Sequence, residues 1–240
     1  MVATCRCALR LLLVSWAILC APSLPVLADC GRTSVRIVGT LEEQVSACQA
    51  LDEVLGYFRA NDSTSAPELT VNFQPAVFVR AGGSAISTNA LLPVCGSYRA
   101  TTHEIQILGS AAGHTTRRPW GLDWGAAMAF SVLEHEIIHA VIAQIMGDQY
   151  EKLPHAWHEA LAYAVQIDLM PNQLREDVLA RYPAEEGFSN TLQINELVYG
   201  LDPDRFAVAA YRTYTRGDKA EFLRTAMGFE FEMLDMSLLP

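Results

Sequence analysis

One short motif in the chain combines residue types that can bind a metal ion and activate water. His135, Glu136 and His139 form an H-E-x-x-H sequence within segment 130–143. On a helix this spacing places the two histidines one turn apart on the same face, where they can share one zinc ion. Glu136 then lies beside the metal, where its carboxylate can take a proton from a zinc-bound water. The motif predicts a catalytic zinc site with Glu136 as the general base.

Glu159 can provide the third protein ligand that such a site needs. Nineteen residues separate His139 from Glu159, which lies in a second helical pattern. Two histidines and one glutamate leave the fourth position of a tetrahedral zinc ion open for chemistry. We therefore expect one Zn²⁺ per chain, bound by His135, His139 and Glu159. The alternative is a chance occurrence of the motif on an ordinary buried helix.

Over residues 126–170 the chain resembles the gluzincin zinc metallopeptidases, the class that includes thermolysin, and it is also similar to the compact minigluzincins. The resemblance implies hydrolysis of peptide bonds, with Glu136 passing the proton to the leaving amine. It also implies a downstream tyrosine or histidine that stabilises the oxyanion. Tyr199 is best placed for this role by its order along the chain, and Tyr211 and Tyr214 are alternatives.

Two positions depart from the pattern of these peptidases. Ala160 stands where the compact members often carry glycine. Tyr163 stands where thermolysin-like enzymes have an aspartate that orients a ligand histidine. Other groups must therefore orient the histidines. His155 and His158 are candidates, and exposed helix histidines are the alternative interpretation of both.

Two other functions remain open with the same residues. The chain could be a zinc-binding protein of the same fold that has lost catalysis and acts in binding or envelope assembly. It could also be an amidase that acts on cell-wall peptides. In the loop at 111–123, His114, Arg117 and Arg118 could reach a substrate carboxylate, or they could simply be solvated.

Residues 1–28 have the features of a secretory signal peptide. Arg6 and Arg10 precede an apolar run of ten residues at 11–20, and small residues lead up to Ala28. We expect cleavage after Ala28 and a periplasmic or secreted protein. An uncleaved anchor is the alternative, but the run is too short to span a bilayer. Beyond it, no stretch is long and uncharged enough for a transmembrane helix.

Three cysteines follow the expected cleavage site, which allows one disulfide and one free thiol in an oxidising compartment. Cys48 could pair with Cys30 or with Cys95, and the sequence does not choose between them. Cysteine ligation of the metal is disfavoured, because the chain has no C-x-x-C pair and the ligand set is already complete.

The charge of the chain is acidic. The formal net charge is −10, and removal of Arg6 and Arg10, with no acid in residues 1–28, would make it −10 − 2 = −12. An acidic protein is a poor partner for nucleic acid or for anionic membranes. We expect a peptide or protein substrate, and the oligomeric state stays open.

The expected fold is a single α+β domain over residues 29–240, with a strand-rich part at 29–110 and a helical part at 111–240. A small mixed sheet precedes a mostly helical half that carries the motif helix and the Glu159 helix. The resemblance implies that strand 98–108 is an edge strand over the cleft, and an internal strand is the alternative. Alternation and capping signals predict strands at 35–38, 68–73, 76–80 and 98–108, and helices at 41–59, 124–146, 155–170, 172–181, 189–199, 203–214 and 217–227. Thr40 with Glu43 three residues later forms a capping box before the first helix, and Gly147 ends the motif helix.

Overall fold

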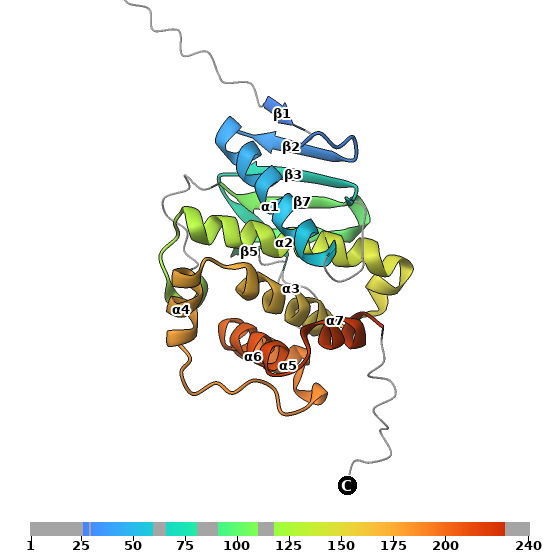
Figure 1. Cartoon of the computed structure of the whole chain (residues 1–240). Coiled ribbons are helices and arrows are strands. Elements are labelled where there is room, and N and C mark those ends of the chain that lie inside the picture. Colours follow the sequence, from blue (N-terminus) through green and yellow to red (C-terminus); the bar gives the residue numbers. More distant parts are fainter. Residues whose placement is uncertain (1–25, 29, 60–65, 81–90, 110–117, 229–240) are drawn as a thin grey trace, which may run out of the picture.

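The N-terminal half of the chain forms a mixed β-sheet with one helix, and the C-terminal half forms a group of helices (Figure 1). The computed structural model describes residues 26–28, 30–59, 66–80, 91–109 and 118–228. The predicted α+β class is confirmed. The strands are β1 (Val26–Ala28), β2 (Val35–Gly39), β3 (Leu69–Gln74), β4 (Val77–Arg80), β5 (Leu91–Val94), β6 (Gly96–Arg99) and β7 (Glu104–Leu108). The helices are α1 (Leu41–Arg59), α2 (Ala126–Met146), α3 (His155–Leu169), α4 (Asn172–Ala180), α5 (Glu196–Leu201), α6 (Pro203–Arg216) and α7 (Lys219–Met227).

The main sheet has the strand order β1-β2-β3-β7-β6. Strands β2, β3 and β7 run parallel, whereas β1 and β6 join the two edges antiparallel. Strands β4 and β5 form a separate antiparallel pair. In β7, Ile105 and Ile107 are buried and alternate with half-buried polar residues, as expected for a strand with one face on the core. In the strand order, β6 is the last strand of this sheet, and it packs against α2.

The prediction of one strand over 98–108 is wrong, because this segment turns back on itself. Strand β6 ends at Arg99 and a short turn leads into β7, with His103 in the left-handed conformation at φ 50°. Arg99 and Glu104 then lie opposite each other. The edge strand and the internal strand, which the sequence presented as alternatives, are the two arms of this hairpin.

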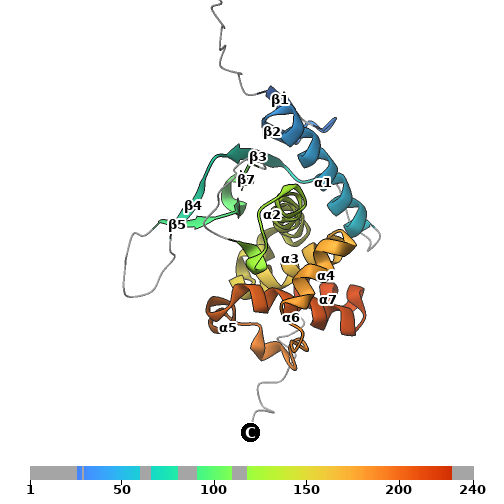
Figure 2. The same ribbon diagram turned by 90° about the vertical axis from the view of Figure 1, so that its left-hand side faces the viewer.

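Helix α2 lies between the sheet and α3 in both views (Figures 1 and 2). It packs against α1 and strands β6 and β7 on one side and against α3 on the other. From Ser131 to Ile142 every residue of α2 is buried. By length and composition the stretch Ala126–Lys152 could cross a membrane, contrary to the expectation from the sequence, but 78% of its most apolar window is buried inside the fold. Its apolar character matches a central core helix.

A capping box fixes the start of α1, as predicted. The backbone N–H of Thr40 donates to Oε2 of Glu43 (2.8 Å), and the N–H of Glu43 donates to Oγ1 of Thr40 (3.3 Å). These bonds satisfy two donors that a helix start leaves open.

The disulfide joins Cys30 to Cys48, which decides between the two pairings that the sequence left open. It links the segment before β2 to the middle of α1. Cys95 is buried at the bend between β5 and β6 and is not part of this disulfide. The disulfide between Cys30 and Cys48 is compatible with an extracytoplasmic location.

The predicted signal peptide lies mostly outside the described residues. Its last three residues form β1, which pairs with β2. Cleavage after Ala28 would remove β1 and leave β2 as that edge of the sheet. The cleavage site itself stays a prediction.

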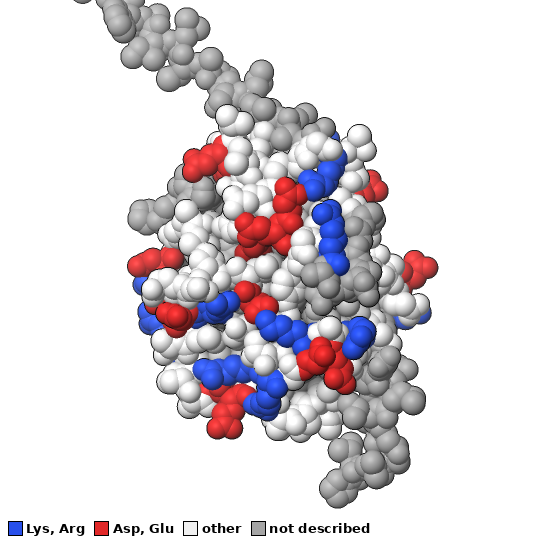
Figure 3. All heavy atoms as spheres, viewed as in Figure 1, with Lys and Arg blue, Asp and Glu red and all other residues white. Residues whose placement is uncertain are grey.

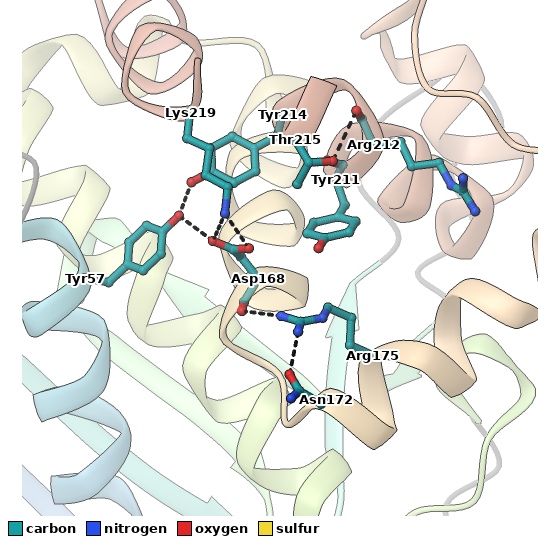
Figure 4. Close-up of polar contacts among 9 residues, drawn as sticks. All are labelled: Tyr57, Asp168, Asn172, Arg175, Tyr211, Arg212, Tyr214, Thr215 and Lys219. Carbon is teal, nitrogen blue, oxygen red and sulfur yellow. Dashed lines mark hydrogen bonds and ion pairs between the residues drawn. The ribbon is translucent and has the colours of Figure 1, made fainter. Parts of the chain in front are cut away.

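A polar cluster joins α1 to the helical half (Figure 4). The phenol of Tyr57 on α1 donates to Oδ2 of Asp168 on α3 (3.0 Å) and lies in a short contact with the phenol of Tyr214 on α6. Lys219 of α7 bonds both oxygens of Asp168, at 2.6 and 2.7 Å. Side chains of four helices thus meet around Asp168. On the face seen in Figure 1, acidic and basic side chains are interspersed over the helical half (Figure 3).

The helix predicted at 189–199 is also wrong. A single 3₁₀ turn at Thr191–Gln193 and the short α5 take its place, because Asn190 and Asn195 each cap a new turn through their side chains. Tyr199 therefore lies in α5. The other predicted helices agree with the structure within about two residues, which is the usual uncertainty of helix ends.

Candidate metal centre

The H-E-x-x-H motif lies in the middle of α2. His135, Glu136 and His139 are only 6 to 7% exposed. The apolar residues of α2 around them place all three inside the protein. They face a cavity of about 670 Å³. All three line this cavity. Low exposure of these side chains strengthens the electrostatic interactions between them.

Glu159 of α3 faces the two histidines. Nε2 of His135 and Nε2 of His139 are 3.1 Å apart. Oε2 of Glu159 lies 3.6 Å from Nε2 of His135, and Oε1 lies 3.5 Å from Nε2 of His139. Zinc bound tetrahedrally at about 2.0–2.1 Å separates its ligand atoms by about 3.3 Å, so these distances fit one ion. This His-His-Glu group could hold a metal ion.

The electrostatics of Glu159 suit a ligand. Burial alone would raise its pKa, but the hydrogen bonds and charges of His135 and His139 outweigh burial and hold the pKa well below its usual range. The carboxylate is therefore ionised at neutral pH. An ionised carboxylate and neutral imidazole nitrogens are the forms that bind zinc.

Glu196 of α5 holds the start of the Glu159 helix. Its Oε1 accepts a hydrogen bond from the backbone N–H of Ala156 (2.7 Å), one of the donors that a helix N-terminus leaves open. Its Oε2 lies 3.5 Å from Nδ1 of His155, whose Nε2 lies 3.5 Å from Oε1 of Glu159. His155 is exposed at the cavity mouth and connects Glu196 with the candidate ligand.

His158 is buried, contrary to the interpretation of an exposed helix histidine. Its Nε2 lies 2.7 Å from the carbonyl oxygen of Leu153, and its ring packs edge-on against Tyr150. Burial, together with the charge of His139, lowers the pKa of His158 to about 4. This ring is therefore neutral at pH 7.

Strand β6 passes directly over Glu136. A Cβ atom on Gly96 would lie 2.7 Å from Oε1 and 2.8 Å from Cγ of Glu136. Only glycine fits at this position without moving the carboxylate. Gly96, Ser97 and Tyr98 line the same cavity as the His-His-Glu group. The edge strand and the candidate general base are thus in contact.

The structure brings Tyr199 to the cavity wall, where its ring packs edge-on against His155 and Phe206. Tyr214 and Tyr211 do not line the cavity. Tyr214 belongs to the Asp168 cluster.

Tyr150 is a cavity residue that the sequence analysis missed. It is 8% exposed and lies in the turn that follows α2. Burial raises its pKa, and the charges of Tyr98, Glu159 and Glu136 raise it further. Its phenol therefore stays protonated, and it lines the same cavity as both glutamates. The sequence held no clear signal for it, since the segment between the two helices has no periodic pattern.

Gln166 is the second residue that the sequence did not indicate. Its Oε1 lies 2.9 Å from Nδ1 of His135. Tyr163, which replaces the expected aspartate, contacts His135 through its ring at a centroid distance of 4.5 Å. The spacing of Glu159, Tyr163 and Gln166 at i, i+4 and i+7 places all three on one face of α3.

Trp120 closes the cavity on the Tyr163 side with an unusual backbone. Its φ is 51°, in the left-handed region that residues other than glycine rarely adopt. Asp204 of α6 accepts hydrogen bonds from the backbone N–H and the indole N–H of Trp120, at 3.0 and 3.1 Å. The indole packs edge-on against Tyr163.

The basic side chains of the loop at 111–123 make no described contribution to the cavity, although Pro119 and Trp120 of the same loop line it. Arg118 is exposed, pairs with Asp123 and does not line it. His114 and Arg117 lie outside the described residues.

Comparison with known proteins adds a family but no activity. No curated protein and no solved structure matches the chain. One family model matches residues 36–230, which include the whole sheet apart from its first strand and all of the candidate centre. The chain belongs to this family, which is described as a family of unknown function, DUF6639.

Proposed function

We propose that the chain is a zinc-dependent peptidase that is exported to the periplasm or secreted. The observation that carries the proposal is the convergence of His135, His139 and Glu159 beside Glu136 in one cavity. A structural zinc site would have a fourth protein ligand, whereas here the fourth position would open into the cavity. The disulfide and the signal-like segment at 1–28 support export.

His135, His139 and Glu159 would hold the ion. When bound there, zinc supplies Lewis acidity, which polarises a carbonyl and makes water more acidic. Glu136 would take the proton of the attacking water and return it to the leaving amine. Its buried carboxylate against Gly96 has little freedom to turn away, and this favours the proton transfers.

Strand β6 would bind the substrate backbone by strand addition. The N–H of Leu108 donates to the carbonyl of Cys95 (2.8 Å), so Cys95 and Ser97 bond toward β7. In an antiparallel ladder the alternate residues, Gly96 and Tyr98, then direct their backbone groups to the open edge. Both residues line the cavity. An extended peptide at this edge would run past Glu136 and the metal.

The oxyanion that forms during hydrolysis needs a donor in addition to the metal. Tyr199 and Tyr150 both line the cavity. Tyr150 is buried in the cavity wall, and burial, with the charges of Tyr98, Glu159 and Glu136, raises its pKa so that its phenol stays protonated, whereas Tyr199 packs against His155 at the cavity mouth. Tyr150 is therefore our first candidate and Tyr199 the second.

The test is zinc-dependent cleavage of a defined substrate class. The purified protein is incubated with a mixed peptide library, with folded proteins and with purified peptidoglycan, before and after metal removal by a chelator and restoration with zinc. We expect cleavage of peptides that chelation abolishes and zinc restores. Release of peptides from peptidoglycan alone would instead support the amidase, and zinc binding without any cleavage would support a binding protein.

A further inference from the structure

The contact between His135 and Gln166 has a consequence for metal binding. We propose that Gln166 is a positioning residue that fixes the tautomer of His135, so that its Nε2 presents a lone pair to the metal. Gln166 is 1% exposed, and its Oε1 lies 2.9 Å from Nδ1 of His135. The inference deepens the proposed function, because it rests on the same metal site.

An amide oxygen can only accept a hydrogen bond. Nδ1 of His135 must therefore carry the ring proton in this contact, and Nε2 of the neutral ring keeps its lone pair. Nε2 is the atom that faces Glu159 and His139. If the Gln166 amide were turned around, its NH₂ group would require a bare Nδ1. The proton would then lie on Nε2 and block the metal ligand.

Ser131 holds the other end of the amide. Nε2 of Gln166 donates to Oγ of Ser131 at 3.0 Å, and the serine is completely buried. Ser131 lies four residues before His135, one helical turn away on the same face of α2. The amide thus bridges two groups of one helix from the neighbouring helix, with its oxygen directed to the histidine.

The neighbouring rings cannot replace this contact. Tyr163 reaches His135 through its ring, with the two planes at 48° and a centroid distance of 4.5 Å. That contact restricts the position of the imidazole but does not choose its tautomer, because a ring face favours neither nitrogen. His155 contacts Glu159 and not His135. Among the described residues, the hydrogen bond that selects the tautomer therefore comes from Gln166.

The first measurement is the zinc dissociation constant of the wild type and three variants by competition with a chelator of known affinity. Loss of a group that orients a ligand histidine typically weakens zinc binding about 10–100-fold, and we expect this for Gln166→Leu. Gln166→Glu keeps an acceptor and should restore most of the affinity. Gln44→Leu removes a similarly buried amide on α1 that donates to the carbonyl of Gly39 at the end of β2, and should leave the affinity unchanged.

The second measurement needs no metal and no activity. Long-range ¹H–¹⁵N NMR on the metal-free protein at about pH 8, above the ordinary pKa of histidine, reports which nitrogen carries each ring proton. We expect Nδ1–H for His135 in the wild type and a shift toward Nε2–H in Gln166→Leu. His139 should carry its proton on Nε2, which then donates to Nε2 of His135 across 3.1 Å.

Two results would overturn the proposal. One is a wild-type His135 protonated on Nε2. The other is a folded Gln166→Leu protein, checked by circular dichroism, that binds zinc as tightly as the wild type. A wild type that binds no zinc but has the expected tautomer would contradict the proposed peptidase and leave the role of Gln166 in place.

Discussion

Gly96 of the edge strand lies directly against the carboxylate of Glu136. A Cβ on Gly96 would approach Oε1 of Glu136 to 2.7 Å, closer than non-bonded atoms allow. The backbone that would bind a peptide and the group that would activate water are therefore fixed relative to each other. Such fixed placement is a large part of how enzymes lower a barrier.

Gly96→Ala tests this contact. The added methyl group must displace Glu136, and it would also press on Cδ1 of Ile107 at 2.9 Å. A displacement of the catalytic group by about 1 Å can lower a rate about 100-fold. We expect a large fall in kcat/KM with unchanged zinc content, measured by peptide cleavage and metal analysis. Gly200→Ala is the matched control, because Gly200 also lines the cavity and its Cβ would meet no atom within 4 Å. Equal activity of both variants would contradict the contact's importance.

The choice of oxyanion donor can be tested with two phenol deletions. Loss of one such donor costs about 10²–10³ in kcat. We expect this loss for Tyr150→Phe and a smaller effect for Tyr199→Phe, with full zinc occupancy in both. Steady-state kinetics on one peptide substrate decides between them. A loss confined to Tyr199→Phe would return the role to the residue that the sequence indicated.

The Asp168 cluster predicts a loss of stability at high pH. Burial, with the charge of Asp168, raises the pKa of Tyr214 to about 12, and burial and the contact with Tyr214 raise that of Tyr57 as well. The unfolded chain loses these protons near pH 10. The stabilisation is therefore complete below about pH 10 and is lost as the pH rises toward about 12.

Urea unfolding across this pH range measures the effect. Tyr214→Phe has no phenol proton to lose at this position, so its free energy of unfolding should fall less steeply between about pH 10 and 12 than that of the wild type. Tyr211→Phe, three residues earlier on α6, serves as the control and should follow the wild type. A Tyr214→Phe curve parallel to the wild type would contradict the role of this phenol.

The disulfide predicts a dependence on redox state. Cys30 and Cys48 are 18 residues apart, and closing a loop of this size contributes about 3 kcal/mol. We expect Cys30→Ser with Cys48→Ser to lower the free energy of unfolding by roughly this amount and to keep the metal site, since neither residue lines the cavity. Chemical denaturation with and without a reductant gives the value.

Local patterns predicted most of the elements, because their causes lie within a few residues. The capping box at Thr40 and Glu43 and the helix stop at Gly147 both agree with the structure. The failures have long-range causes. The segment at 98–108 alternates like one strand, and only pairing of its two arms shows the turn at His103.

The candidate site divides in the same way. A spacing of four residues on one helix sufficed for His135 and His139, and a second helical pattern suggested Glu159. Gln166 could not be found in this manner, because a single glutamine in a helical pattern has no distinctive spacing. Tyr150 could not be found either, because it lies between the two helices, outside any periodic pattern. Their roles follow from contacts between α2, α3 and the turn that joins them.

The most direct test combines zinc content and cleavage in the wild type, Glu136→Gln and Glu159→Ala. Zinc per chain is determined by metal analysis, and cleavage is followed on the best peptide from the library. The account predicts about one zinc in the wild type and in Glu136→Gln, with cleavage only in the wild type, and loss of both in Glu159→Ala. Equal cleavage by wild type and Glu136→Gln, or a wild type without zinc, would contradict it.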